Sequence, residues 1–269
     1  MPGAVAVLGA GVMGETLLSG LLRAGWPASD LIVSGRRPER IAELVDRYAV
    51  RGLASADAAA VAGTVLLVVK PQDMAALLDE VADRLQPGTL VVSVAAGITT
   101  AFLEQRLPSG TPVVRVMANT PALVDEGMAA ISPGAHCDDE HLAVAEQLLS
   151  SCGRVVRLPE KHQDAVTALS GSGPAYVFYV VEAMIEAGVL LGLPRSTSTD
   201  LVVQTLYGAA TMLRETGEHP TVLRERVTSP AGTTVSAVRQ LDDHKVRAAF
   251  LTAVEAARDR SRELAGGLG

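Results

Sequence analysis

The chain has few of the residues that nucleic-acid, metal and disulfide chemistry require. Aromatic residues account for 3% of its 269 residues, which leaves little material for stacking bases, and the net charge of −7 argues against a nucleic-acid or anionic membrane surface. Its two cysteines, Cys137 and Cys152, form no CxxC pair, and its five histidines lack metal-ligand spacing. We therefore expect no nucleic-acid partner, no metal site, and reduced thiols in the cytoplasm.

The sequence also lacks a recognisable targeting or membrane segment. A strand-like run begins at Ala4 and leaves no charged region of the kind that opens a signal peptide. The longest run without charged residues, 85–103, contains Pro87, Gly88 and Gly97, and its pattern indicates a helix end, a strand and a loop. We expect no membrane partner.

The first 160 residues alternate short apolar runs with amphipathic helical patterns. Met13, Leu17 and Leu21 form one stripe of a helix over 13–24, and Pro38 stands at the favoured first position of another. Repeated units of this kind predict a doubly wound parallel sheet. The predicted strands are Val5–Leu8, Leu31–Ser34, Val65–Val69, Leu90–Val94, Val113–Val116, Met128–Ile131 and Val155–Leu158.

The pattern changes after residue 159. Residues 163–264 are helical in pattern, with breaks at 170–174, 191–195, 216–220 and 229–232 that each contain Gly or Pro. Segment 174–192 is apolar on nearly every face, which in a soluble protein requires cover from more than one neighbour. A small helical domain would not supply that cover, so we expect a homodimer built through this half.

A glycine motif follows the first predicted strand. Residues Gly9-Ala10-Gly11-Val12-Met13-Gly14 fit G-x-G-x-x-G at the start of a strand–helix–strand unit, the context that makes the motif typical of dinucleotide binding. Gly9 permits the tight turn, Gly11 lets a diphosphate approach the backbone, and Gly14 allows close packing of helix and strand. The free N–H groups of the following helix favour the diphosphate. The predicted fold class is therefore α/β, a Rossmann-type doubly wound parallel sheet followed by an all-α dimerisation domain.

The end of the second predicted strand bears on the choice of dinucleotide. An NAD enzyme usually places Asp or Glu there to accept hydrogen bonds from the ribose hydroxyls. This chain reads SGRRPER from Ser34, with no acid at the tip and with Arg36 and Arg37 close behind. Two guanidinium groups would bind a 2′-phosphate through charge-assisted hydrogen bonds, although two solvated arginines on a turn are the plain alternative. We expect NADPH, with NADH as a second cofactor.

Other strand ends should border the same crevice. Lys70 is one of three lysines in the chain and follows a predicted strand, where it would lie near a nicotinamide or its ribose. Its neighbours and the small residues after the next strand complete the candidate cofactor site, which adds Val69, Lys70, Pro71, Ala95, Ala96 and Gly97.

Residues 227–238, VTSPAGTTVSAV, contain no carboxylate, histidine, cysteine or lysine. Pro230 and Gly232 predict a helix start, whose unpaired N–H groups and the Ser229 hydroxyl could receive a carboxylate. From the residues alone, a plain helix N-cap rich in hydroxyl groups is an equally good interpretation.

Several stretches together resemble the Δ1-pyrroline-5-carboxylate reductase family. They are GAGVMG at 9–14, VVKP at 68–71, VAAG at 94–97, MANTPA at 117–122, LSGSGPAY at 169–176 and, most specifically, SPAGTT at 229–234. The resemblance runs in register from about Val5 to Glu263. Two departures are Ser55, where the family often has Asn near the adenosine ribose, and Ala118 of MANTP, where it commonly has Pro.

The resemblance implies NAD(P)H-dependent reduction of a cyclic imine, the last step of proline biosynthesis. It assigns cofactor binding to residues 1–159, with Ser55 near the ribose, and substrate binding and dimerisation to residues 160–269. It also implies a homodimer, with a ring of dimers (a decamer) as the larger assembly. The substrate-binding and catalytic residues that it indicates are Ser229, Gly232, Thr233 and Thr234, with the Thr234 hydroxyl at the ring nitrogen.

Two other functions compete with this interpretation. A β-hydroxyacid dehydrogenase also joins a Rossmann domain to helices, but it needs a basic lysine in the first helices after the sheet, and no lysine lies between Lys161 and Lys245. A non-catalytic dinucleotide-binding module would explain the glycine motif, but it gives residues 227–238 no purpose.

Overall fold

The computed structural model describes residues 3–266, and these group into two compact units. One unit contains the described residues up to Ser172 together with those from Ala257 onward, and the other contains Gly173–Ala256. The last helix of the chain therefore contributes residues to both units. The assignment of cofactor binding to residues 1–159 and of substrate binding and dimerisation to residues 160–269 describes function and stays a prediction.

The first unit is built on an eight-stranded sheet in the order β3-β2-β1-β4-β5-β6-β7-β8. All neighbouring strands pair in parallel except β6 and β7, which are antiparallel. The doubly wound sheet is confirmed, and each predicted strand is present within about two residues. The strands are β1 (Val5–Leu8), β2 (Leu31–Ser34), β3 (Arg51–Gly52), β4 (Thr64–Leu67), β5 (Leu90–Ser93), β6 (Val113–Met117), β7 (Gly127–Pro133) and β8 (Gly153–Arg157).

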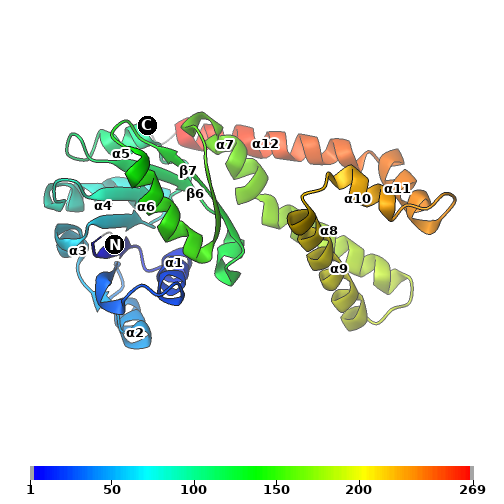
Figure 1. The fold of residues 1–269 in the computed structure, drawn as a ribbon, viewed down its shortest axis with the longest axis horizontal. Coiled ribbons are helices and arrows are strands. Elements are labelled where there is room, and N and C mark those ends of the chain that lie inside the picture. The colour runs from blue at the N-terminus through cyan, green and yellow to red at the C-terminus, as the bar shows by residue number, and fades with distance from the viewer. Residues whose placement is uncertain (1–2, 267–269) are drawn as a thin grey trace. The chain divides into compact units, whose positions relative to one another are not determined.

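Helices cover both faces of this sheet (Figure 1). Each strand turns alternate side chains to opposite faces, so Val5 and Val7 of β1 join one apolar core while Ala6 and Leu8 join the other. The first core is closed by α1 (Val12–Arg23), α2 (Pro38–Tyr48) and α6 (Asp139–Leu149), and the second by α3 (Ser55–Val61), α4 (Met74–Val81) and α5 (Thr100–Glu104). Two covered faces explain why the strands are continuously apolar.

Local sequence signals fix the helix ends. Pro38 is the first residue of α2, and Asp138 caps α6 by accepting a hydrogen bond from the His141 N–H at 2.9 Å, while His141 reaches back to the Asp138 N–H. Short 3-10 turns complete the connections: η1 (Ala28–Asp30), η2 (Pro71–Asp73), η3 (Ala82–Arg84), η4 (Thr120–Val124), η5 (Ser150–Cys152) and η6 (Glu160–His162).

The segment 170–174, predicted as a helix break, differs from that expectation. After α7 (Gln163–Val166) the chain widens into a π-helical turn, Thr167–Gly171, and only Ser172 bends before α8 begins. The Ser172 N–H donates to the Thr167 carbonyl at 2.8 Å, the i→i+5 bond that accommodates one extra residue. A side chain at Gly171 would overlap the Met117 side chain, so glycine permits the close passage without ending the helix.

The second unit is helical. Its elements are α8 (Gly173–Leu190), α9 (Arg195–Thr216), α10 (Pro220–Arg226), α11 (Thr233–Asp243) and most of α12 (Val246–Gly266). The helices α8 and α9 lie side by side in Figure 1, and the Ser198 hydroxyl donates to the Ile185 carbonyl at 2.8 Å. A side chain at Gly188 would overlap Ser198, so glycine lets this pair approach closely.

Helix α8 contains no buried residue within one chain. Its exposed apolar side chains include Val177, Phe178, Tyr179, Met184 and Leu190. By length and composition alone, the helical stretch Glu160–Leu190 is apolar enough to cross a membrane. The same properties characterise a helix whose apolar surface is covered by a second subunit.

Candidate functional site

A cavity of about 520 Å³ opens at the carboxyl ends of three neighbouring strands in the first unit. Strand β1 lies between β2 and β4, so the chain leaves it in opposite directions on the two sides, which creates the crevice where open α/β sheets bind ligands. The lining residues are Leu8, Gly9, Ala10, Gly11, Gly35, Arg36, Arg37, Arg40, Ser55, Val68, Val69, Lys70, Asp73, Ala76, Leu77 and Glu80.

The glycine loop forms one wall of this cavity. Gly9 has a φ of +126°, and a side chain there would come within 2.5 Å of the Val68 carbonyl oxygen. A side chain on Gly14 would overlap the Gly9 carbonyl, whereas one on Gly11 would meet no atom within 4 Å. Gly9 and Gly14 therefore build the turn, and Gly11 leaves room above the backbone at the start of α1.

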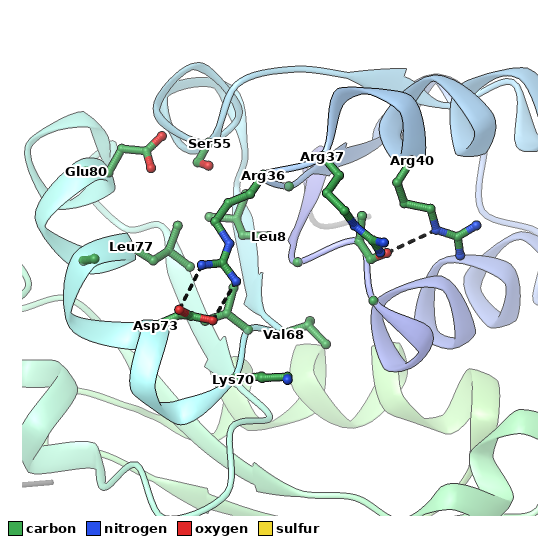
Figure 2. A pocket seen from close by; sticks show the side chains of 16 residues that line it. Leu8, Arg36, Arg37, Arg40, Ser55, Val68, Lys70, Asp73, Leu77 and Glu80 are labelled. Atoms are coloured by element: carbon green, nitrogen blue, oxygen red, sulfur yellow. Dashed lines mark hydrogen bonds and ion pairs between the residues drawn. The ribbon is translucent and has the colours of Figure 1, made fainter.

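The β2–α2 loop forms the adjacent wall and presents its arginines (Figure 2). The Arg36 guanidinium makes two hydrogen bonds with the Asp73 carboxylate, at 3.0 and 2.9 Å. Arg37 is exposed, and its side chain makes no hydrogen bond or ion pair within residues 3–266. The two adjacent arginines thus differ, since one already has a carboxylate partner and the other has none.

A third arginine, Arg40, ties this wall to the glycine loop. Its Nε donates to the Ala10 carbonyl oxygen at 3.3 Å, and its guanidinium pairs with Glu15 on α1 and with Glu43. Burial alone would raise the pKa of Glu15, but hydrogen bonds from Tyr48 and Arg40 outweigh it and hold that pKa below its ordinary value. Glu15 therefore stays ionised and keeps Arg40 in place against the loop.

The remaining predicted cofactor residues divide into two groups. Ser55, Val69 and Lys70 line the cavity, and the Lys70 side chain makes no hydrogen bond or ion pair in the part of the chain that the structure describes. Ser34 is buried behind the cavity with its hydroxyl 3.2 Å from that of Ser55. Those outside the cavity lining are Val12, Met13, Gly14, Ser34, Pro71, Ala95, Ala96 and Gly97.

Sequence reasoning missed several side chains of the cavity. Arg40 could have been found, because Pro38 fixes the helix start and so places residue 40 in its first turn, beside the loop. Asp73, Leu77 and Glu80 carry no such signal, since they approach the β2–α2 loop only through the packing of η2 and α4 in the sheet.

The hydroxyl-rich segment lies in the second unit and starts a helix as predicted. The Gly232 N–H donates to the Ser229 carbonyl at 3.1 Å, and Ala231 has a φ of +59°, the features of a type II turn with Pro230 at its second position. Helix α11 begins at Thr233 with no side-chain cap, so the N–H groups of its first turn are open to a ligand.

Two threonine hydroxyl groups at the start of α11 are also unengaged, whereas Thr228 and Ser236 on either side donate to the carbonyl four residues earlier. Threonines inside α9, such as Thr205 and Thr211, donate to the carbonyl four residues earlier. The hydroxyl groups of Thr233 and Thr234 make no such bond, nor any other within residues 3–266, and Thr234 is half-buried. A side chain on Gly232 would overlap the Ser229 hydroxyl, so glycine allows Ser229 to lie against the helix start.

No three His, Cys, Asp or Glu side chains among the described residues come together as a metal-ligand set. Cys152 is buried and Cys137 is half-buried, and burial raises the pKa of both thiols. Neither cysteine belongs to the cavity lining.

The fold and the cavity define a Rossmann-type dinucleotide-binding oxidoreductase with a helical second unit. Residues 4–97 match a family model described as NADP oxidoreductase, coenzyme F420-dependent, and residues 160–264 match one described as pyrroline-5-carboxylate reductase dimerisation. The chain is 47% identical over 264 residues to a pyrroline-5-carboxylate reductase of Corynebacterium melassecola, with 97% of this chain and 98% of that one covered. The chain belongs to the pyrroline-5-carboxylate reductase family, which confirms the resemblance seen in the sequence.

Solved structures agree with this assignment. A pyrroline-5-carboxylate reductase from Coxiella burnetii superposes with a TM-score of 0.94 at 33% identity, covering 98% of this chain and 99% of that one. The Plasmodium falciparum pyrroline carboxylate reductase, solved with NADP bound, superposes with a TM-score of 0.85 at 27% identity, covering 97% and 98%.

Proposed function

We propose that this protein reduces 1-pyrroline-5-carboxylate to L-proline with NADPH, the last step of proline biosynthesis. The observation that carries the proposal is the 47% identity to a pyrroline-5-carboxylate reductase over almost the whole of both chains. The chain also has the two chemical parts that the reaction needs, a dinucleotide cavity and an open helix start surrounded by hydroxyl groups.

The cavity fits NADPH on its own features. The open space at Gly11 and the N–H groups at the start of α1 suit a diphosphate, while the unpaired Arg37 guanidinium on the adjacent wall suits a 2′-phosphate. Ser55, held by Ser34, offers a hydroxyl toward the ribose, and Lys70 and residues 95–97 extend the site from the next strand ends. When bound, NADPH supplies the hydride, so the protein needs no nucleophile of its own.

The segment Ser229–Thr234 is assigned to the substrate. The open N–H groups of the first turn of α11, with the Ser229 hydroxyl, bind the substrate carboxylate. The Thr234 hydroxyl hydrogen-bonds the ring nitrogen and so orients the C=N bond. A cyclic imine is readily protonated, which explains how a segment without Asp, Glu, His or Lys can serve this reaction.

The two halves of the chain take different roles in this proposal. Residues 1–159 bind the dinucleotide, and residues 160–269 bind the substrate and hold the subunits together. The exposed apolar side chains of α8 and the match of residues 160–264 to a dimerisation model support a homodimer, and a ring of five dimers is its proposed larger form. We place the enzyme in the cytoplasm, where its thiols would stay reduced.

A coupled assay tests this function directly. Purified protein with NADPH and pyrroline-5-carboxylate should consume NADPH and form proline in equal amounts. Neither a β-hydroxyacid dehydrogenase nor a non-catalytic dinucleotide-binding module would form proline. Oxidation of a β-hydroxyacid in place of imine reduction, or binding of NADPH without turnover, would refute the proposal.

A further inference from the structure

The Arg36–Asp73 ion pair crosses the cavity from the β2–α2 loop to the turn that precedes α4 (Figure 2). Both oxygens of Asp73 accept from the terminal nitrogens of Arg36, at 3.0 and 2.9 Å. This is the planar, two-bond geometry with which arginine also grips phosphate. A carboxylate therefore occupies a guanidinium that the sequence assigns to the 2′-phosphate of the cofactor.

The carboxylate is the fixed member of this pair. The Asp73 side chain is 26% exposed and that of Arg36 is 82% exposed. The Asp73 N–H donates to the Lys70 carbonyl at 2.9 Å, and Met74, the next residue, is fully buried. Arg36 is thus free to move toward a new partner, while Asp73 stays where it is.

The other arginines of the cavity show how unusual Arg36 is. Arg40 is bound to Glu15 and Glu43 away from the loop tip, and Arg37 has no partner in the described chain. A 2′-phosphate that binds at this wall can pair with Arg37 directly. To pair with Arg36, it must either displace Asp73 or bind Arg36 next to the negative charge of Asp73.

We propose that Asp73 weakens the preference of this enzyme for NADPH over NADH by competing with the 2′-phosphate for Arg36. The proposal rests on the proposed use of NADPH. NADPH exchanges one Arg36 partner for another and meets repulsion from Asp73, which lowers the net gain from its phosphate. NADH has no charge at that position and leaves the Arg36–Asp73 pair intact. Asp73 therefore narrows the difference in affinity between the two dinucleotides.

The test measures dinucleotide binding to the full-length enzyme without substrate. Asp73→Asn removes the charge and keeps the size of the side chain. It should not harm the fold, because the Asp73 side chain makes no capping hydrogen bond to α4 and Asn is an equally good cap. Because ion pairs this exposed contribute little, we expect the NADPH dissociation constant to fall about threefold to fivefold, with that of NADH unchanged.

Two further variants separate competition for Arg36 from a general effect of charge. Glu80 lines the same cavity and its side chain makes no hydrogen bond or ion pair among the described residues, so Glu80→Gln removes an equal charge without freeing an arginine. In an Arg36→Gln background, Asp73→Asn should no longer tighten NADPH selectively. Melting temperatures of all variants show that the fold is retained.

Three results would overturn the proposal: weaker or unchanged NADPH binding in Asp73→Asn, an equal gain from Glu80→Gln, or a gain that persists without Arg36. Failure of the wild type to form proline would refute the proposed function and leave this binding test standing. Failure of the wild type to bind either dinucleotide would overturn both.

Discussion

Gly14 in α1 packs so closely against Gly9 that a side chain on Gly14 would overlap the Gly9 carbonyl oxygen, while Gly11 between them faces open space. The three glycines of one motif therefore have different physical duties. Two are required by the fold of the loop itself, and the third by what the loop binds.

Alanine substitutions should separate these duties. Gly14→Ala should lower the free energy of unfolding by about 1–3 kcal/mol, because the overlap involves backbone that cannot rotate away. Gly11→Ala should leave the melting temperature unchanged and raise the NADPH dissociation constant about tenfold, because its methyl group enters the space assigned to the diphosphate. Thermal melting and NADPH titration check both. Equal melting temperatures for the two variants would contradict this division.

Arg37 should matter for NADPH and not for NADH. Arg37→Gln removes the unpaired guanidinium of the cavity, so KM for NADPH should rise about tenfold, and replacing Arg36 as well should raise it further. Steady-state kinetics with each cofactor measure the effect. Arg51→Gln is the matched control, since Arg51 is an exposed arginine on the neighbouring strand β3 that lies outside the cavity lining. An equal rise in KM for NADPH and for NADH would refute the assignment of Arg37 to the 2′-phosphate.

Thr234→Val tests the substrate segment. It keeps the β-branched shape and deletes the hydroxyl, so kcat/KM for the imine should fall about 10- to 100-fold while KM for NADPH stays the same. Thr199→Val is the control, because Thr199 already donates its hydroxyl to the Arg195 carbonyl at 2.9 Å. Wild-type turnover in a folded Thr234→Val enzyme would show that a group other than the Thr234 hydroxyl orients the substrate nitrogen.

Glu160 should make stability depend on pH. Burial alone would raise its pKa, but hydrogen bonds from Thr100 and Arg115 outweigh this and hold the pKa below its ordinary value. A lowered pKa stabilises the folded chain above the pKa of the unfolded state, and this contribution is lost as the pH falls through the folded value.

Glu160→Gln should therefore lower the free energy of unfolding at neutral pH by about 2 kcal/mol. The difference between variant and wild type should shrink in acid, below the ordinary range of glutamate. Denaturant melts at several pH values measure it. A constant difference at every pH would mean that the charge of Glu160 contributes nothing.

The subunits should associate through the helical half. Light scattering without detergent should give a particle of two or more 27.9 kDa chains. Phe178→Glu, at a position that is 66% exposed within one chain, should dissociate it, because a charge would be buried in the interface. A wild-type monomer at micromolar concentration would refute this, and dependence on detergent or lipid would favour a membrane role for Glu160–Leu190.

The architecture of the first unit could be predicted from its sequence. Because both faces of the sheet are covered, its strands are continuous apolar runs, which are easy to recognise in the sequence. The edge strand β3 was missed because its two residues are exposed and bury no apolar pattern. The sequence predicts a break at 170–174 because glycine usually marks a helix end, whereas here Gly171 permits a close passage beside Met117.

The candidate site was predictable where residues are close in sequence and less so where the fold joins them. The glycine loop and the arginines after β2 follow motifs with a known mechanism. The Arg36–Asp73 pair joins residues 37 positions apart, and its existence depends on side-chain reach across a cavity that no local pattern describes.

The contact from Arg40 to the Ala10 carbonyl has a consequence for engineering the cofactor preference. Arg40 is hydrogen-bonded to the glycine loop and paired with Glu15 of α1. It therefore connects the start of α2 directly to the glycine loop and to the helix that follows it. Exchanging residues 34–40 for the corresponding loop of an NAD enzyme would remove the Arg40 contact to the glycine loop and leave Glu15 paired only with Arg47 and Tyr48. A graft that is meant to keep the glycine loop in place would therefore have to carry Arg40 along.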